Sequence, residues 1–491
     1  MPSKFDVPVD NPAALIKWAE QLWHEGSQQR PDFVPRLSLA FYHGHHFLIL
    51  DPRDRRVRKF RNDSRDPHAP VRISAPIIGD IIDRVIAKLT KHLPVPEARP
   101  VTDEPDDRDA AKVATKILAH EWDRLRMQTK MPELYSWVVP VGYAFLQITW
   151  DADDGTQIGR DKDGNSISSG EINVDIASSF ELIYDSGAKT IEDARWCIRT
   201  SALTPREVYE RYGIEVESEE IHRTLGDELL GLDNVFNDTA KPVHRVAVRQ
   251  LWIRPKAMRS VPDGIVVTWA GQKVIALKPF PYKHGKLPFV QINYQSPQGS
   301  SYGRTPVPQL IPLQMDYNDA KSRMATIRRM LAPKLTAPEG SVDFDALTSR
   351  VEGVPYKEAF GGKPEWLMPD GRWMSQFTEA MDRAEREMKE RMGLTEANTG
   401  QLPGTSAAAT AIQQAELASE PQTIPQLELI KAIEAVGWNI LQLVRQYWRE
   451  KRVIRTWSKA GTLEIRRFSR ADLTKQTDVK VTQESGLPRS K

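Results

Sequence analysis

Three neighbouring histidines are the first residues of this chain whose types could do chemistry. His43, His45 and His46 surround Gly44, and in an extended segment His43 and His45 would share one face, as two ligands of one metal ion must. No further ligand set stands nearby in the sequence. We therefore favour packed or surface histidines beside a turn, and we predict no metal site.

The single cysteine and the acidic turns offer two further possibilities. Cys197 stands between apolar residues in ARWCIRT, whereas a nucleophilic thiolate needs a thiolate-stabilising setting, so we expect a buried structural cysteine. The segments DADDG and DKDG resemble fragments of calcium loops. Asp161 and Asp163 precede a glycine at the wrong offset, and no glutamate closes the loop, so hairpin tips are the better interpretation.

The motifs of common catalytic and nucleotide-binding sites are missing. The sequence has no GxxxxGK[ST] phosphate loop, GxSxG elbow, HExxH pair or GxGxxG fingerprint. We predict no catalytic residues and no cofactor, and we do not expect an enzyme. A DNA-processing enzyme such as a nuclease stays open as an alternative, and it would need a cluster of carboxylates around a metal ion.

Length and composition are those of an ordinary globular protein. The 491 residues suggest about three domains or one elaborated domain. Lys and Arg total 68 and Asp and Glu 66, and the net charge of +2 excludes a protein that binds nucleic acid by bulk positive charge. One cysteine excludes an internal disulfide, no apolar run could span a membrane, and the polar N-terminus is unlike a signal peptide. We expect a soluble protein of a reducing, intracellular compartment.

Roughly the first 300 residues contain both helix and strand patterns, and we predict that they form one α+β body. Helix signals cover residues 12–26, 77–89 and 205–213. Asp163-Gly164 is a hairpin signal before EINVDI. VAVRQLWIRP, GIVVTWAGQKVIAL and KLPFVQINYQ are predicted as three antiparallel strands.

Two matched helices give the strongest periodic signal. Apolar residues recur in alternating steps of four and three over 313–331 and again over 373–392. They are Leu313, Tyr317, Ala320, Met324, Ile327 and Leu331, then Met374, Phe377, Met381, Ala384 and Met388. A seam this narrow leaves most of each helix polar, so it favours a wall between neighbouring subunits and water over a hairpin buried on the body. We predict a ring of identical copies.

The remaining segments are defined by prolines and by one polar loop. Residues 332–372 form a proline-punctuated module between the two helices. The polar loop LTEANTGQLPGTS follows the second helix, and an alanine-rich helix interrupted by Pro421 and Pro425 comes next. A helix over 426–451 and two strand-like pieces complete the chain.

With these segments in this order, the chain resembles the portal proteins of tailed bacteriophages over nearly its whole length. The similar segments are FYHGHHFL, SAPIIGDIIDRVIAKLTKHLPVPEARPVTDEPDD, VGYAFLQITWD, IYDSGAKTIEDARWCIRTSALTPREVYERYG and YGRTPVPQLIPLQMDYNDAKSRMATIRRMLAPKL. The resemblance implies an α+β portal fold with an α/β wing, two long stem helices, a small clip module and an α-helical crown. It assigns 1–305 to the wing, 306–331 and 373–393 to the stem helices, 332–372 to the clip, 394–406 to a tunnel loop, 407–425 to a wing helix, and 426–491 to the crown and C-terminal segment.

The same resemblance implies the function and the partners. Portal proteins form a dodecameric ring at one capsid vertex, through which double-stranded DNA is packaged and ejected. The large terminase docks there first, head-completion or tail adaptor proteins dock later, and the major capsid and scaffolding proteins surround the ring. The expected location is the virion, and the host cytoplasm during assembly. Family members usually continue past a segment such as DVKVTQESGLPRSK, so the resemblance also implies a truncated C-terminus.

Candidate site residues follow from that assignment. The tunnel-loop candidates are Thr395, Glu396, Asn398, Thr399 and Gln401; the stem-channel candidates are Arg323, Arg328, Glu379, Arg383, Arg386, Glu387 and Glu390; the clip candidates are Phe344, Tyr356, Phe360 and Trp366. Five acids against four bases over 379–391 suit a wall that does not hold DNA tightly. The alternatives are another ring-forming virion connector, a nuclease and a monomeric cytosolic adaptor.

Overall fold

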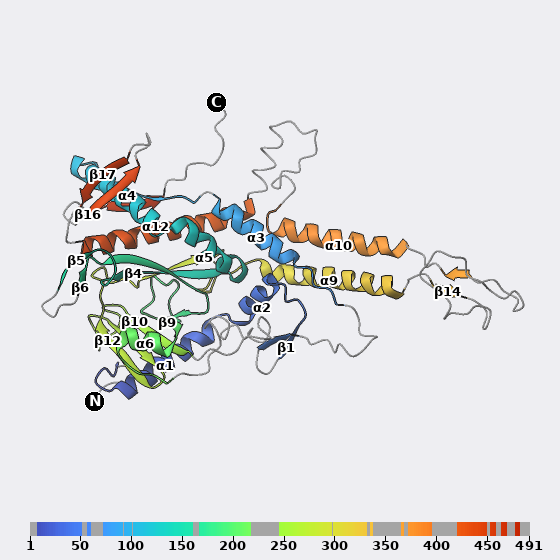
Figure 1. Ribbon diagram of the computed structural model, residues 1–491, viewed down its shortest axis with the longest axis horizontal. Helices are drawn as coiled ribbons and strands as arrows, with labels where there is room; N and C mark the ends of the chain where they lie inside the picture. The colour runs from blue at the N-terminus through green and yellow to red at the C-terminus, as the bar shows by residue number, and fades with distance from the viewer. Residues whose placement is uncertain are drawn as a thin grey trace, which may run out of the picture.

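The computed structural model of the chain shows a mixed helical and β body from which two long helices, α9 and α10, extend side by side (Figure 1). The structure describes residues 7–51, 56–59, 72–91, 93–100, 102–160, 166–217, 245–296, 298–330, 334–336, 365–367, 372–394, 420–448, 452–457, 463–468 and 477–481. The α+β class predicted from the sequence is confirmed. Within these ranges, no helix combines the length and the apolar character needed to cross a membrane.

A five-stranded antiparallel sheet forms one half of the body. Its strands, in spatial order, are β12 (Lys273–Pro279), β11 (Ile265–Ala270), β10 (Val246–Ile253), β9 (Trp196–Leu203) and β8 (Leu182–Tyr184). Helix α1 (Pro12–Gln29) packs on one face, and α6 (Pro205–Tyr212) packs on the other. The side chain of Asn11 accepts a hydrogen bond from the Ala14 N–H at 3.2 Å, so the predicted start of α1 is confirmed, and so is the capping box of α6.

A three-stranded antiparallel sheet forms the other half. Its order is β13 (Phe289–Asn293), β4 (Tyr143–Asp151) and β7 (Glu171–Ala177). The segment KLPFVQINYQ forms an antiparallel strand as predicted, β13, and its partner is β4 and not either of the two preceding segments. The intervening segment GIVVTWAGQKVIAL forms both β11 and β12. Helix α5 (Met127–Val141) and helix α12 (Glu420–Tyr447) contact β4 of this sheet.

The main hydrophobic core lies between this sheet and a group of helices. Those helices are α2 (Phe33–Tyr42), α3 (Ile77–Thr90), α4 (Pro105–Arg124), α5 and α12. The predicted interruption at Pro421 and Pro425 is wrong, since α12 is continuous through both prolines. The N–H groups in the first turn of a helix have no intrahelical acceptor, so Pro421, which has no N–H group, removes no hydrogen bond there.

Five two-stranded antiparallel sheets complete the described strands. They are β1 (Leu48–Asp51) with β2 (Arg56–Lys59), β3 (Pro96–Pro100) with β18 (Thr477–Val481), β5 (Gln157–Arg160) with β6 (Ser166–Ser168), β14 (Lys334–Thr336) with β15 (Glu365–Leu367), and β16 (Arg452–Trp457) with β17 (Leu463–Phe468). Strands β5 and β6, which flank the predicted hairpin at Asp163, pair with each other, whereas Asp163 lies outside the described residues. EINVDI, which forms β7, pairs with β4 instead.

The start of α9 is fixed by a close backbone contact at Gly142. This residue ends α5 at φ 110°, a left-handed conformation that glycine adopts freely. A Cβ at Gly142 would lie 2.8 Å from the carbonyl oxygen of Gly303 and from the backbone of Arg304, and the Gly142 carbonyl accepts a hydrogen bond from the Tyr294 N–H at 2.8 Å. The chain that leads into α9 therefore lies directly against the α5–β4 corner.

Candidate functional site

Helices α9 (Val307–Met330) and α10 (Arg372–Arg391) form the helix pair that the two apolar repeats predict. With 24 and 20 residues, they are about 36 Å and about 30 Å long. Ala320 of α9 and Met381 and Ala384 of α10 are buried along the pair, and Met388 of α10 is buried in the main hydrophobic core. Figure 1 shows the pair leaving the body near α2 and α3 and running out toward β14.

A second buried face of α9 is polar, and the sequence analysis missed it. Gln314, Asn318 and Ser322 are at most 8% exposed, and all three face the segment that leads into α3. The Ser322 hydroxyl accepts from the Ile73 N–H at 3.0 Å, Asn318 Oδ1 from the Ala75 N–H at 3.1 Å, and Gln314 Oε1 from the Ile78 N–H at 3.1 Å. We call these three side chains the polar ladder.

The polar ladder caps α3 from another element. The first N–H groups of a helix have no intrahelical partner, and Pro76, at the N-cap of α3, provides no side-chain hydrogen bond. Gln314 replaces that cap, and its amide also donates to the Ala75 carbonyl at 2.8 Å and to Asn318 Oδ1 at 3.1 Å. The spacing of four residues between the members of the polar ladder was the signal in the sequence that they share one helix face. An interpretation based on hydrophobic periodicity, however, places polar residues toward solvent.

His46 lies at the centre of this contact. Its ring is 4% exposed and stacks on Phe41 with centroids 5.0 Å apart. Nδ1 lies 2.9 Å from the Asn318 amide nitrogen and 2.8 Å from the Ser74 hydroxyl, and Nε2 lies 3.2 Å from the Phe41 carbonyl oxygen. Burial lowers the pKa of His46, and the hydrogen bond to Phe41 opposes that shift.

A third face of α9 borders an open groove of about 740 Å³. Met315 is 54% exposed, and Asp319 and Arg323 form an ion pair at 2.8 Å. The groove is lined by α9, by Phe377 of α10, and by His46, Phe47 and Arg72 of the body. Its lining thus combines apolar side chains with charges of both signs.

The outward face of α10 carries most of the stem-channel candidates. Glu379, Arg383, Arg386 and Glu390 are exposed. Glu387 pairs with Arg391 at 2.6 Å, and Glu385 pairs with Lys389 at 2.6 Å, each at a spacing of four residues. On α9, Arg328 is exposed and Arg323 is held by Asp319. The structure therefore brings these candidates onto two adjacent helices, where acids and bases alternate.

Most of the other predicted site residues fall outside the part of the chain that the structure describes. The tunnel-loop candidates Thr395, Glu396, Asn398, Thr399 and Gln401 lie outside the described residues, as do the clip candidates Phe344, Tyr356 and Phe360 and the calcium-loop candidates Asp161 and Asp163. Trp366 is in β15, opposite Leu335 of β14.

The histidine and cysteine predictions are confirmed as packing roles. His46 is packed as described above, and His43 follows the last residue of α2, with its ring 4.9 Å from that of Tyr42. Cys197 is fully buried in β9, and burial raises the pKa of its thiol well above the usual value. Among the described residues, no three metal-ligating side chains gather at one point.

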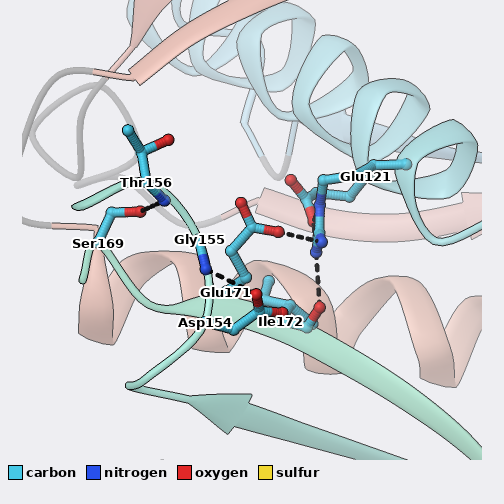
Figure 2. Close-up of polar contacts among 8 residues, drawn as sticks. Glu121, Asp154, Gly155, Thr156, Ser169, Glu171 and Ile172 are labelled. Carbon is cyan, nitrogen blue, oxygen red and sulfur yellow. Dashed lines mark hydrogen bonds and ion pairs between the residues drawn. The ribbon is translucent and has the colours of Figure 1, made fainter.

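A partly buried ionic contact ties α4 to β7, and it too was missed. Arg124 donates to Glu121 at 2.7 Å, to Glu171 at 2.5 Å and to the Ile172 carbonyl at 2.6 Å, and the Glu121 carboxylate is almost fully buried. Burial lowers the pKa of Arg124, but the two carboxylates outweigh it and raise the pKa overall. Figure 2 shows Glu121 and Glu171 around this contact, next to the turn of Asp154, Gly155 and Thr156. With all its groups paired, the cluster stabilises the body and offers no free acid or base.

Comparison with known proteins identifies one family. The model of the family described as phage P22-like portal protein matches residues 35–484. Among solved structures, a chain of "Neck of empty GTA particle computed with C6 symmetry" is 12% identical, with a TM-score of 0.38 over 84% of this chain and 82% of that chain. A likeness at this TM-score supports no statement about fold or function. The search of curated proteins finds no match.

Proposed function

Because the chain belongs to the phage P22-like portal protein family, we propose that it is the portal of a phage-like particle. In this role identical copies form a ring at one capsid vertex, and double-stranded DNA enters and leaves through the ring. The observation that carries the proposal is the family match over residues 35–484. The α9–α10 pair supports it, because the pair extends from the body with its charged face exposed.

The proposed division of the chain follows the order of its elements. Residues 1–305 form the wing, α9 and α10 are the stem helices, 332–372 form the clip, and 394–406 form the tunnel loop. Residues 407–425 would be a wing helix and 426–491 the crown, although α12 crosses the boundary between those last two units. The clip would contact the large terminase during packaging and a head-completion or tail adaptor afterwards.

The groove beside α9 is the surface on which we expect the adjacent copy to pack. A ring of identical subunits uses heterologous contacts, so each copy needs two different complementary surfaces. Met315 offers an exposed apolar anchor at the groove, and Asp316, Arg323 and Arg72 offer charges of both signs around it. Such a mixture of an apolar centre and a charged rim is typical of protein interfaces.

The charge pattern of α10 suits a channel that lets DNA slide. A protein that neutralises six to ten phosphates binds DNA with an affinity that falls by about 10³–10⁵ between 50 and 200 mM salt. Alternating acids and bases on α10 cancel locally, so the wall has no continuous positive stripe to hold the phosphate backbone. We expect the tunnel loop to contact DNA without sequence preference.

Native mass spectrometry with negative-stain imaging tests the assembly. We expect a ring of about twelve copies, in line with the family resemblance, and the introduction of a negative charge at the groove by Met315→Glu should shift the mass toward single subunits. The exposed and distant Tyr209→Glu provides a matched control, because Tyr209 is 54% exposed on α6. A wild-type protein that stays monomeric at all concentrations would exclude the portal role.

Deletion of residues 395–406 tests the DNA-contacting segment separately. We expect rings of unchanged mass that package or retain less DNA in a reconstituted packaging reaction. Unchanged packaging by the deleted chain would remove the tunnel-loop assignment while leaving the ring intact.

A further inference from the structure

The contact between α9 and the body is held in one register. The polar ladder meets three backbone donors, at Ile73, Ala75 and Ile78, all with lengths between 3.0 and 3.1 Å. Buried N–H groups of this kind are satisfied almost without exception in folded proteins. Any movement of α9 along the body must therefore provide new acceptors for all three donors.

A shift by one helical turn fails in both directions. In one direction Leu310 would replace Gln314, and an alkyl side chain cannot accept the Ile78 N–H. In the other direction Thr326 would reach the position of Ser322, but Val307 and Leu310, both fully buried, would leave the core. The register of α9 on the body is therefore unique as long as the polar ladder is intact.

The same hydrogen bonds determine the protonation state of His46. Asn318 Oδ1 accepts from the Ala75 N–H and from Gln314 Nε2, so the Asn318 NH₂ group faces His46 Nδ1 at 2.9 Å. An amide NH₂ group can only donate, so Nδ1 must be unprotonated and accept. The proton of the neutral ring is then on Nε2, which faces the Phe41 carbonyl at 3.2 Å.

Ser74 offers the alternative partner for a protonated ring. Its hydroxyl lies 2.8 Å from His46 Nδ1 and donates to the Gly44 carbonyl at 2.8 Å, which leaves an oxygen lone pair for an N–H donor. A protonated Nδ1 could donate to Ser74, which belongs to the body, but would oppose the donor of Asn318, which belongs to α9. Neutral His46 thus bonds to the stem helix, whereas charged His46 bonds only within the body.

We propose that His46 is a proton-operated release for helix α9: the neutral ring completes the polar ladder, and protonation at Nδ1 breaks its bond to Asn318 and loosens α9 from the body. This device is independent of the proposed portal function, since every group in it belongs to one chain.

The charged groups around His46 do not cancel this effect. On α9, Asp319 is paired with Arg323 at 2.8 Å, and Asp316 lines the outer part of the groove. From the body, Arg72 lines the same groove and disfavours a second positive charge. On α3, Asp83 accepts a hydrogen bond from the Tyr42 hydroxyl at 2.7 Å, and Asp80 is exposed; His43 and His45 flank the ring on its own segment.

The direction of the pH effect follows from burial. The pKa of His46 is lower in the folded chain than the value of about 6.5 for a free imidazole. The contribution of the neutral ring is therefore complete above about pH 6.5 and is lost as the pH falls through the folded pKa. The local opening constant should rise about tenfold for each pH unit between the free and the folded pKa.

Amide hydrogen exchange of the full chain between pH 7.5 and pH 5.0 tests the release. After correction for intrinsic exchange, the peptide covering 72–80 should lose protection at least severalfold, while the peptide covering 143–151 of β4 should not change. Equal losses in both peptides, or no loss in either, would overturn the proposal, and this comparison needs only the wild-type protein.

Two variants separate His46 from other titrating groups. His46→Asn retains an oxygen that can accept from Asn318 but cannot titrate, so it should abolish the pH dependence of the 72–80 peptide. His284→Asn is the matched control, because burial and the neighbouring Lys286 lower the pKa of His284 to about 4 in a distant loop. The proposal fails if His46→Asn folds and keeps the wild-type pH dependence, or if His284→Asn removes it.

Discussion

The two buried faces of α9 hold the helix by different means. Toward α10 the contact is apolar, with Ala320 of α9 and Met381 and Ala384 of α10 as its buried residues. Toward the body the contact is the polar ladder, in which each side chain accepts one particular N–H group. Apolar burial depends on area and volume and tolerates small changes of position. Buried hydrogen bonds do not tolerate such shifts, because donor and acceptor must stay within bonding distance. The apolar seam therefore stabilises the pairing of α9 with α10, and the polar ladder fixes the position of α9 along the body.

Among substitutions that conserve volume, the largest loss of stability is expected on the polar face. Asn318→Leu leaves the Ala75 N–H without its acceptor and removes one of two partners from Gln314 Nε2, which keeps the Ala75 carbonyl, and from His46 Nδ1, which keeps the Ser74 hydroxyl. We expect the free energy of unfolding to fall by about 3 kcal/mol, because a buried unsatisfied group costs about 1–3 kcal/mol and each lost hydrogen bond about 1 kcal/mol. Urea denaturation followed by tryptophan fluorescence measures it, and a loss under about 1 kcal/mol would contradict the importance of the ladder.

A matched change on the apolar face should cost less. Met381 of α10 is buried and lies outside the main core cluster, and Met381→Leu conserves its volume and apolar character. We expect a loss under about 1.5 kcal/mol in the same denaturation experiment. Met381→Ala, which leaves a cavity, should cost about 2–5 kcal/mol and shows that the position is sensitive to volume. If Met381→Leu were as costly as Asn318→Leu, the contrast between the two faces would not hold.

The smallest effect is expected on the exposed third face. Arg323 and Asp319 form an ion pair with side chains that are 66% and 58% exposed. Such pairs contribute about 0–1 kcal/mol, so Arg323→Ala should change stability by less than about 0.5 kcal/mol. A clear loss of ring assembly with unchanged subunit stability would indicate that Arg323 acts between copies.

Sequence periodicity predicted the helix pair well and its environment poorly. The four-and-three spacing identified α9 and α10 because apolar seams repeat locally along the chain. The polar ladder was invisible to the same method, since a buried amide and a solvated amide have the same polarity. Asn318 is buried because its side chain bonds to backbone groups at 73–78, and these groups lie more than 230 residues earlier in the sequence.

The partner of β13 could not be predicted from the sequence for a related reason. KLPFVQINYQ has the apolar character of a buried strand, but nothing in it distinguishes β4 from β11 as a neighbour. A contact at Gly142 helps to determine the partner of β13. The Gly142 carbonyl accepts a hydrogen bond from the Tyr294 N–H, directly after β13, and this bond holds β13 beside β4. Such a contact joins residues too distant for a local pattern to relate.

The placement of the polar ladder also has a mechanical consequence. The α9–α10 pair is built into the body at one end, where Met388 and Leu394 enter the main core, and the ladder extends the support outward only as far as Ser322. Beyond Ser322, α9 continues for eight residues, or about 12 Å, beside α10, and no further hydrogen bond from this stretch to the body is found among the described residues. A sideways load on the far end therefore becomes a bending moment, and the hydrogen bond between Ser322 and Ile73 is the first to be pulled open.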